Sequence, residues 1–457
     1  MFYDYFTINF FGDKNDNTKL TVRANRTHQS HAITAYDDYR WLVFLFGFIT
    51  WLNGSLIPFL QMVCDLNHIE AYMVTLVFYI AYTVMAMPSA KILQIFSYKQ
   101  GMSFGLGTMA FGAMLFIPAA QIQAYWLFLV ALFTLGSGLT LLQTAANPYI
   151  VLIGSKDTAA VRISIMGILN KSAGVVAPLL FSAMVFSDIA SFSPEALAQL
   201  NSIQKQLQLQ ELANRLITPY FVMAIALAIL AALIMLAPLP DIEQPKTSNN
   251  SESKSVLQFP HLVLGVIALF FYIGAEVIAG DTIGLYGKEQ GVLQFAELTS
   301  YTMGFMVLGY VLGIVLIPRF FSQQQALIFS ALSGCVFSLC IILIEPQQTA
   351  IANVVLFWLA DNSFPDTVLF VALLGLSNAL VWPTIWPMAL ANLGDKTQTG
   401  AALLIMGISG GALLPLVYGV FAEYTGNAQQ AYYLLIPCYA FILYYALIGH
   451  KLTSWRK

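Results

Sequence analysis

The sequence predicts an all-α integral membrane protein, with twelve transmembrane helices in two pseudo-symmetric six-helix bundles. Its composition, an even series of apolar segments and motifs that recur between the two halves support this class. Hydrophobic residues make up 58% and charged residues 9% of the 457 residues, so the surface is too apolar for a chain dissolved in water. The net charge of −3 and the lack of a basic stripe argue against a nucleic-acid partner.

Twelve apolar segments are long enough to span a bilayer core of about 30 Å, which requires about twenty helical residues. A further segment, Ile351–Ala360, is too short to cross and is expected in the loop between the ninth and tenth spans. The twelve segments are Trp41–Val63, Ala71–Leu93, Gly101–Gln121, Tyr125–Ile150, Arg162–Phe186, Leu216–Leu236, Leu262–Tyr286, Phe295–Phe320, Ala326–Ile344, Thr367–Ala391, Gly400–Ala422 and Ala431–Gly449.

The distribution of Lys and Arg predicts the orientation of these spans. Sixteen of the twenty Lys and Arg residues fall on the side that holds both termini, and only Lys205, Arg215 and Lys288 fall on the other side. The remaining one, Lys171, lies inside a span. Positively charged loops stay in the cytoplasm, so both termini are expected there.

The chain is expected to divide into a tail, two bundles and a linker. Residues 1–38 form a cytoplasmic tail, residues 39–237 the first bundle, residues 238–260 a cytoplasmic linker, and residues 261–457 the second bundle with a short tail. The linker assignment rests on its many Ser, Asn and Pro residues, which are typical of flexible connections.

One amphipathic helix is expected outside the membrane. Ser193–Ile217 begins with Ser and Pro, which is a helix-start signature, and it carries apolar residues at helical spacing. We expect this helix to lie over the first bundle in a structural role. The apolar positions are Leu197, Leu200, Ile203 and Leu207.

Short motifs recur at nearly the same offset in the two halves. Gly136–Pro148 aligns with Gly375–Pro387, and Ile165–Ile168 aligns with Ile405–Ile408, both with the sequence Ile-Met-Gly-Ile. Two such matches at an offset near 240 residues are hard to attribute to chance. Duplicated six-helix halves joined by a cytoplasmic linker are the major facilitator architecture, in which a substrate site lies at the midplane between the halves.

Amide and indole side chains near the span centres are the candidate substrate ligands. Amides that donate and accept hydrogen bonds, next to flat aromatic rings, suit a neutral, hydroxyl-rich solute such as a sugar. The alternative for the amides is bridging between neighbouring helices, and for the indoles packing around the kinks at Pro383 and Pro387. The candidates are Asn53, Gln143, Asn147, Asn170, Asn378, Trp382 and Trp386.

Three charged residues inside the spans are the candidates for cation coupling: Lys171, Glu276 and Asp281. A charge at mid-membrane costs roughly 2.5–3.5 kcal/mol on insertion scales, so it marks a partner or a pathway. Glu276 and Asp281 point about 140° apart on a regular helix, and we expect a break at Gly280 that lets both face one cavity. Asp281 is expected near the outer mouth, exposed to water. The alternative for Glu276 is a structural ion pair with Lys171.

The coupled cation remains open between a proton and a sodium ion. Burial favours the neutral form of a carboxyl and a neighbouring ammonium favours its ionised form, so the Lys171–Glu276 pair suits a proton. Two carboxylates, from Glu276 and Asp281, also suit sodium. No metal-ligand cluster or nucleophile–base set is present in the sequence, so we expect no catalytic residue, no bound metal and no cofactor apart from the co-transported ion.

Four stretches resemble the fucose/glucose/galactose branch of major facilitator sugar transporters, closest to bacterial glucose/galactose and N-acetylglucosamine transporters. They are Phe46–Gln61, Leu141–Gly154, Arg162–Leu180 and Tyr272–Val277. The resemblance implies cation-coupled uptake of a hexose or N-acetylhexosamine by alternating access. It also implies a monomer that contacts membrane lipid in the bacterial inner membrane.

The sequence departs from the fucose–proton members of that branch. Those members carry an Asp in the first span and a Glu in the fourth, and the matching positions here are Gly54 and Gln143. The coupling role of those acids therefore does not transfer, which is why the hypothesis moves to the three charged residues above.

Two other functions remain open from the sequence alone. The same fold serves exporters of amphiphilic compounds, although the central amides disfavour that use. A membrane sensor that binds sugar without moving it is the other alternative. An enzyme is the least favoured reading because no catalytic constellation is present.

Overall fold

The computed structural model describes residues 44, 47–152, 159–186, 200–236, 256–317, 320–356, 364–393 and 396–455. The predicted cytoplasmic tail and most of the predicted linker lie outside these residues, so the domain boundaries stay predictions. The side chains of Asn53 and Asn147 also lie outside the described part of the chain.

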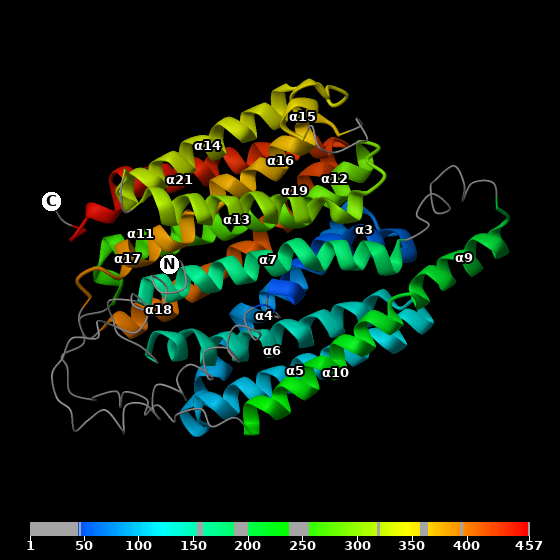
Figure 1. Cartoon of the computed structure of the whole chain (residues 1–457), viewed down its shortest axis with the longest axis horizontal. Coiled ribbons are helices and arrows are strands. Elements are labelled where there is room, and N and C mark those ends of the chain that lie inside the picture. The colour runs from blue at the N-terminus through cyan, green and yellow to red at the C-terminus, as the bar shows by residue number, and fades with distance from the viewer. Residues whose placement is uncertain are drawn as a thin grey trace, which may run out of the picture.

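The described chain is helical throughout, and the helices run roughly parallel to one long axis (Figure 1). Eleven helices are long and apolar enough to cross a membrane, and Gly54–Cys64 is a shorter apolar helix. These twelve coincide with the twelve predicted spans. The shorter helix corresponds to the second part of the first predicted span, whose beginning lies outside the described residues.

The first six spans are built from seven helices. Six of these helices contain a proline, which membrane helices tolerate because neighbouring groups satisfy the freed backbone atoms. The helices are α3 (Asn53–Cys64), α4 (His68–Ile95), α5 (Tyr98–Ile122), α6 (Tyr125–Leu152), α7 (Ala159–Val185), α9 (Ser202–Asn214) and α10 (Ile217–Leu236).

The last six spans are more interrupted, because all of them except α14 are formed by consecutive helical segments. The longer helices are α11 (Pro260–Val277), α13 (Leu298–Leu316), α14 (Gln323–Leu343), α16 (Asp366–Asn378), α17 (Val381–Leu390), α18 (Thr397–Met406), α19 (Gly410–Thr425) and α21 (Leu435–Leu447). The short ones are α12 (Ile283–Glu289), α15 (Ala350–Val355) and α20 (Ala428–Ala431). α15 occupies the segment that was predicted to be too short to cross.

The predicted amphipathic helix differs from the observed one. The helix α9 begins at Ser202, where Asn201 accepts from the backbone N–H of Gln204 in a capping box, whereas the predicted start at Ser193 lies outside the described residues. Ile203 and Leu207 are 70% and 66% exposed, so these two positions of the predicted apolar stripe do not pack on the bundle, and Leu197 lies outside the described residues. Only the last turn of α9 is buried, and the helix projects from the end of the molecule (Figure 1).

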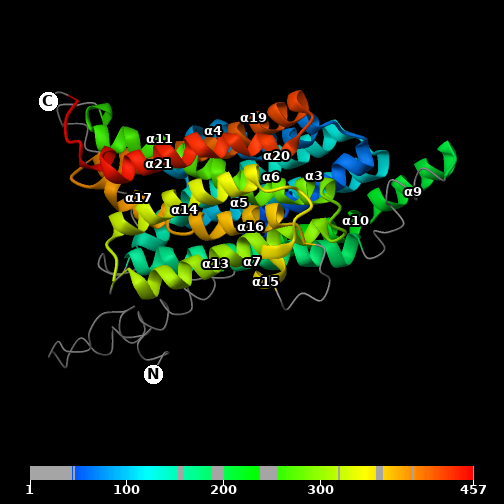
Figure 2. The same cartoon turned by 90° about the horizontal axis from the view of Figure 1, so that it is seen from above.

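The two sets of six spans meet along two main lines. The helix α7 packs against α13, and α4 packs against α19; each contact joins a helix of the first set to a helix of the second. The end of the bundle that carries His68, Glu289 and Glu423 is called the His68 end below. Helices α9, α12 and α15 lie at this end, and α17 and α18 lie at the opposite end (Figures 1 and 2).

The seventh span changes its winding where the sequence predicts a break. Ile278–Thr282, which includes Gly280 and Asp281, forms one turn of π-helix between α11 and α12. Such turns are rare and frequently occur at functional sites. Two hydroxyls of α13 satisfy backbone carbonyls of this turn: Thr299 donates to Gly280 O at 2.7 Å and Thr302 donates to Ala279 O at 3.3 Å.

Candidate functional site

Lys171 and Glu276 form an ion pair between the two halves of the molecule. The ammonium Nζ of Lys171, on α7, contacts the carboxylate Oε1 of Glu276, on α11. Lys171 is 8% and Glu276 4% exposed. Removing two charges from water is expensive, so this cross-bundle contact holds only while the two helices stay together.

An indole ring completes the surroundings of the ammonium. Lys171 Nζ lies 4.2 Å from the ring centroid of Trp51, which is a cation–π distance. The Trp51 Nε1 group donates to Asn170 Oδ1 at 3.2 Å, and this bond fixes the plane of the ring. Asn170 therefore bridges two helices of the first half, as the structural alternative for the amides predicts, and it lies beside the ion pair.

The second half closes over this indole with apolar and phenolic side chains. Trp51, Met303, Met306 and Tyr310 form one buried cluster, in which the last three residues come from α13. A Cβ atom at Gly280 would lie 2.6 Å from the Trp51 ring. Glycine at this position thus lets the π turn approach the indole closely.

Asp281 does not lie where the sequence analysis expects it. It is 0% exposed, so the prediction of a carboxylate wetted near the mouth is wrong for this conformation. Its Oδ2 atom accepts from Thr75 Oγ1, on α4, at 3.1 Å, while Glu276 faces Lys171 on α7. Helices packed against the seventh span from two sides therefore separate the two carboxyls.

Gln143 takes part in a polar and aromatic chain that reaches the interface. Its Nε2 group donates to Tyr82 OH at 3.0 Å, and Tyr82 is stacked with Tyr79 at 5.9 Å between ring centroids. A Cβ at Gly411, on α19, would touch Tyr79 at 3.1 Å. Gln143 is thereby connected to the contact between α4 and α19.

The remaining candidates of the second half lie around the part of α11 that precedes Glu276. Asn378 is 0% exposed and accepts from Tyr439 OH at 2.9 Å, while its Nδ2 atom has no hydrogen-bond partner in the described structure. Trp382 and Trp386 lie 5.3 Å apart, and Trp382 lies 6.4 Å from Tyr272 between ring centroids. Tyr272 precedes Glu276 by one helical turn.

The structure explains why the first span carries Gly54. A Cβ atom there would overlap the Thr299 hydroxyl and lie 2.7 Å from Gly280 O. An aspartate at this position would collide with the π turn in this conformation. Asn53 and Asn147 were also predicted as ligands, and their side chains lie outside the described residues.

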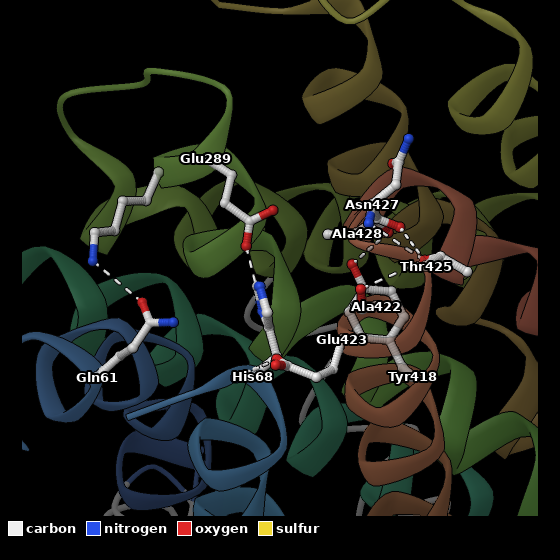
Figure 3. A network of polar contacts seen from close by, with 10 residues as sticks. Gln61, His68, Glu289, Tyr418, Ala422, Glu423, Thr425, Asn427 and Ala428 are labelled. Carbon is white, nitrogen blue, oxygen red and sulfur yellow. Dashed lines mark hydrogen bonds and ion pairs between the residues drawn. The ribbon is translucent and has the colours of Figure 1, made fainter. Parts of the chain in front are cut away.

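Polar contacts hold the two halves together at the His68 end. His68 Nδ1 lies 3.5 Å from Glu289 Oε1, and the His68 backbone N–H donates to Glu423 at 3.2 Å; Figure 3 shows His68 and Glu289 facing each other across this interface. Further bonds between the halves are Lys288 Nζ to Gln61 Oε1 (3.3 Å), Ser182 Oγ to Glu297 Oε1 (2.9 Å), Ser300 Oγ to Val175 O (2.7 Å) and Ser55 Oγ to Ala296 O.

A cavity of about 540 Å³ also lies at the His68 end. It is lined by Glu289, Gln290, Gly291, Gln347, Thr349 and Pro365. All of these residues belong to the second half, and none is a predicted site residue. A carrier site between the halves requires groups from both, so the Lys171–Glu276 region fits that role better.

Sequence reasoning missed three residues of the site. Trp51, Thr75 and Thr299 carry no charge, and aromatic or hydroxyl side chains are common in membrane helices. Their contacts depend on how neighbouring helices are rotated, which a single sequence does not report. The short distance between Trp51 and the candidate Asn53 along the chain was the only available signal.

Comparison with known proteins agrees with this architecture. Residues 41–415 match the Major Facilitator Superfamily. The chain belongs to this superfamily. Among its superfamily relatives, the chain is 33% identical to a glucose/galactose transporter of Brucella abortus over 417 residues, which cover 90% of this chain and 92% of the relative. It is 27% identical to the L-fucose-proton symporter of Escherichia coli, with 89% and 90% covered.

Solved structures of the superfamily give the same result. The E. coli fucose:proton symporter superposes with a TM-score of 0.68 at 25% identity, over 91% of this chain and 98% of that one. A second structure of that symporter, described as outward, gives a TM-score of 0.67 at 26% identity, with the same coverage. These superfamily members are transporters, in agreement with the expectation that the chain is not an enzyme.

Proposed function

We propose that this protein takes up a hexose or N-acetylhexosamine by cation symport, through alternating access, across the bacterial inner membrane. The observation that carries this proposal is the likeness to a glucose/galactose transporter along 90% of the chain. The central amides and paired indoles, which suit a sugar ring, support it. We take the protein to work as a monomer surrounded by lipid.

The His68 end faces outward in this proposal, because the Lys and Arg residues gather at the opposite side. The contacts at this end then form a closed outer gate. Sugar bound between the halves would reach the cytoplasm from this conformation, and opening of the His68 end would return the site to the outside. The outward form of the E. coli symporter provides the superfamily precedent for that second conformation.

The proposed sugar site lies between the ion pair and the amides. Glu276 and Asn170 offer acceptors, Gln143 and Asn378 offer amide donors, and Trp382 offers a ring face. Each sugar hydroxyl has to exchange a bond with water for one with the protein. Truncation of a single amide therefore leaves one hydroxyl unpaired, at a cost of about 1–3 kcal/mol.

Sugar counterflow in proteoliposomes tests the proposal. Vesicles loaded with unlabelled glucose, galactose, N-acetylglucosamine or fucose should accumulate the labelled form of at least one of them, and Gln143→Ala should raise the half-saturating concentration about 5- to 150-fold. Gln121→Ala, at an exposed position, is the matched control and should behave as the parent. If no sugar undergoes counterflow while the vesicles efflux ethidium, the protein is an exporter.

A further inference from the structure

Asp281 is buried in a way that a sugar ligand would not require. It lies on the π turn Ile278–Thr282, is fully buried, and accepts one hydrogen bond from Thr75. Its second oxygen, Oδ1, has no hydrogen-bond partner among the described residues. The carboxyl is therefore only half satisfied, and its one partner belongs to the other half of the protein.

Among the described residues, no positive charge compensates this carboxyl. The ionisable groups within its electrostatic reach are Tyr72 and Tyr79 of α4 and Glu276 of α11, none of which supplies a cation. Lys171 is paired with Glu276. A carboxylate buried without a cation is strongly disfavoured.

Other elements that pack on the π turn leave this balance unchanged. Helices α3 and α13 contribute neither a carboxyl nor a cation. Glu423 of α19 accepts from the backbone N–H of His68, and Glu289 of α12 faces the His68 ring. On α12, Lys288 donates to Gln61, and on α16, Asp366 accepts from the backbone N–H of Ala352 at 2.7 Å. Protonation of Asp281 removes the uncompensated charge without rearranging any of these contacts.

The oxygens around the π turn suit a proton better than sodium. Carbonyls freed where a membrane helix unwinds are the usual ligands for sodium in transporters. Here the carbonyls of Ala279 and Gly280 already accept from Thr302 and Thr299 of α13. Thr75, the hydrogen-bond partner of Asp281, belongs to α4 in the opposite half. The oxygen atoms around the π turn therefore do not converge on a single site for a sodium ion.

We propose that Asp281 carries the coupled proton, and that its protonation is the condition for closing the His68 end, where Thr75 and Asp281 meet. This inference rests on the proposed transport function and identifies its cation. The Asp281 carboxylate takes up one proton from outside water and becomes a neutral carboxylic acid, which the closed interface can bury.

Release on the other side regenerates the carboxylate. When the halves separate on the cytoplasmic side, the Asp281 carboxyl gives its proton to cytoplasmic water. Asp281 is left ionised in a dry interface, and this unfavourable state drives the His68 end open again.

Transport by an Asp281→Asn variant tests the assignment. Asparagine imitates the neutral carboxyl, so sugar counterflow should remain within about threefold of the parent, while accumulation driven by a pH gradient should fall to the equilibrium level. Asp366→Asn is the matched control, because Asp366 is another buried acid of the second half, whose carboxylate accepts from the backbone N–H of Ala352. It should keep gradient-driven accumulation.

A distance measurement provides a readout that does not depend on sugar flux. Spin labels at Gln121→Cys and Tyr424→Cys, on exposed positions of the two halves at the His68 end, report its closure after the four native cysteines are replaced by alanine. In the parent background, the distance distribution should shift from long to short as the pH falls. With Asp281→Asn the distance distribution should no longer depend on pH, because asparagine does not titrate.

The outcomes separate this inference from the proposed function. Absence of counterflow in the parent would overturn the transport function itself. If counterflow is intact but Asp281→Asn still accumulates sugar on a pH gradient, Asp281 is not the proton carrier. Accumulation by the parent on a sodium gradient alone, or a label distance that ignores pH, would equally overturn the inference.

Discussion

Breaking the Lys171–Glu276 pair should destabilise the protein, and the size of the effect follows from the contacts. Removal of one partner from a buried ion pair costs about 3–5 kcal/mol. In Glu276→Gln the ammonium keeps the face of Trp51 at 4.2 Å, a contact worth up to about 2 kcal/mol when desolvated. We therefore expect a loss at the lower end, about 3 kcal/mol in the free energy of unfolding.

Replacing both partners should restore most of that loss. A buried pair exchanged for apolar residues of similar volume is often neutral or stabilising, so Lys171→Met with Glu276→Leu should be more stable than either single variant. The coupling energy from the double-mutant cycle should be about 2 kcal/mol or more. The cycle compares the parent, Lys171→Met, Glu276→Leu and the double variant. Their free energies of unfolding are measured in detergent from the fluorescence of the seven tryptophans.

An exposed pair of the same kind serves as the control. Arg215 and Glu211 are four residues apart on the chain, with 3.3 Å between Nη2 and Oε1, and the Glu211 side chain is 70% exposed. Their coupling energy should be about 0.3–0.5 kcal/mol. If the Lys171–Glu276 cycle gives an equally small value, so that the single losses simply add, the two groups do not form a buried pair and the proposed centre is misplaced.

Three further variants probe the π turn and the closed end. Gly54→Ala inserts a methyl group against the Thr299 hydroxyl and Gly280 O, and should cost about 1–3 kcal/mol in thermal unfolding; an unchanged transition would show that this contact is loose. Thr299→Val leaves Gly280 O without its hydroxyl donor and should cost about 1–3 kcal/mol, which a parent-like stability would contradict. His68→Ala removes the contact to Glu289, where both side chains are partly exposed, so stability should change by less than about 1 kcal/mol. It should nevertheless speed the reaction of a cysteine introduced at a buried position of the His68 end with a membrane-impermeant thiol reagent. Equal reaction rates in His68→Ala and the parent would contradict the proposed outer gate.

The sequence by itself determined the spans and the positions where chemistry is concentrated. Apolar segments of membrane length are local properties of the chain, so all twelve coincide with helices of the structure or, for the first, with the part that is described. The charges at Lys171, Glu276 and Asp281 stood out because a polar group in lipid is costly wherever its helix packs. Gly280 marked the break in the seventh span because glycine weakens a regular helix.

Only the tertiary structure decided which of these groups face each other. Glu276 meets Lys171, whose ammonium lies over Trp51, whereas Asp281 meets Thr75. This division follows from the rotation of α4 and α7 around the seventh span. The expected exposure of Asp281 was wrong for the same reason: depth along a span is readable from the sequence, but burial depends on the neighbouring helices. Helix rotation is set by side-chain packing between segments that are far apart in the chain. It therefore cannot be predicted from a single sequence.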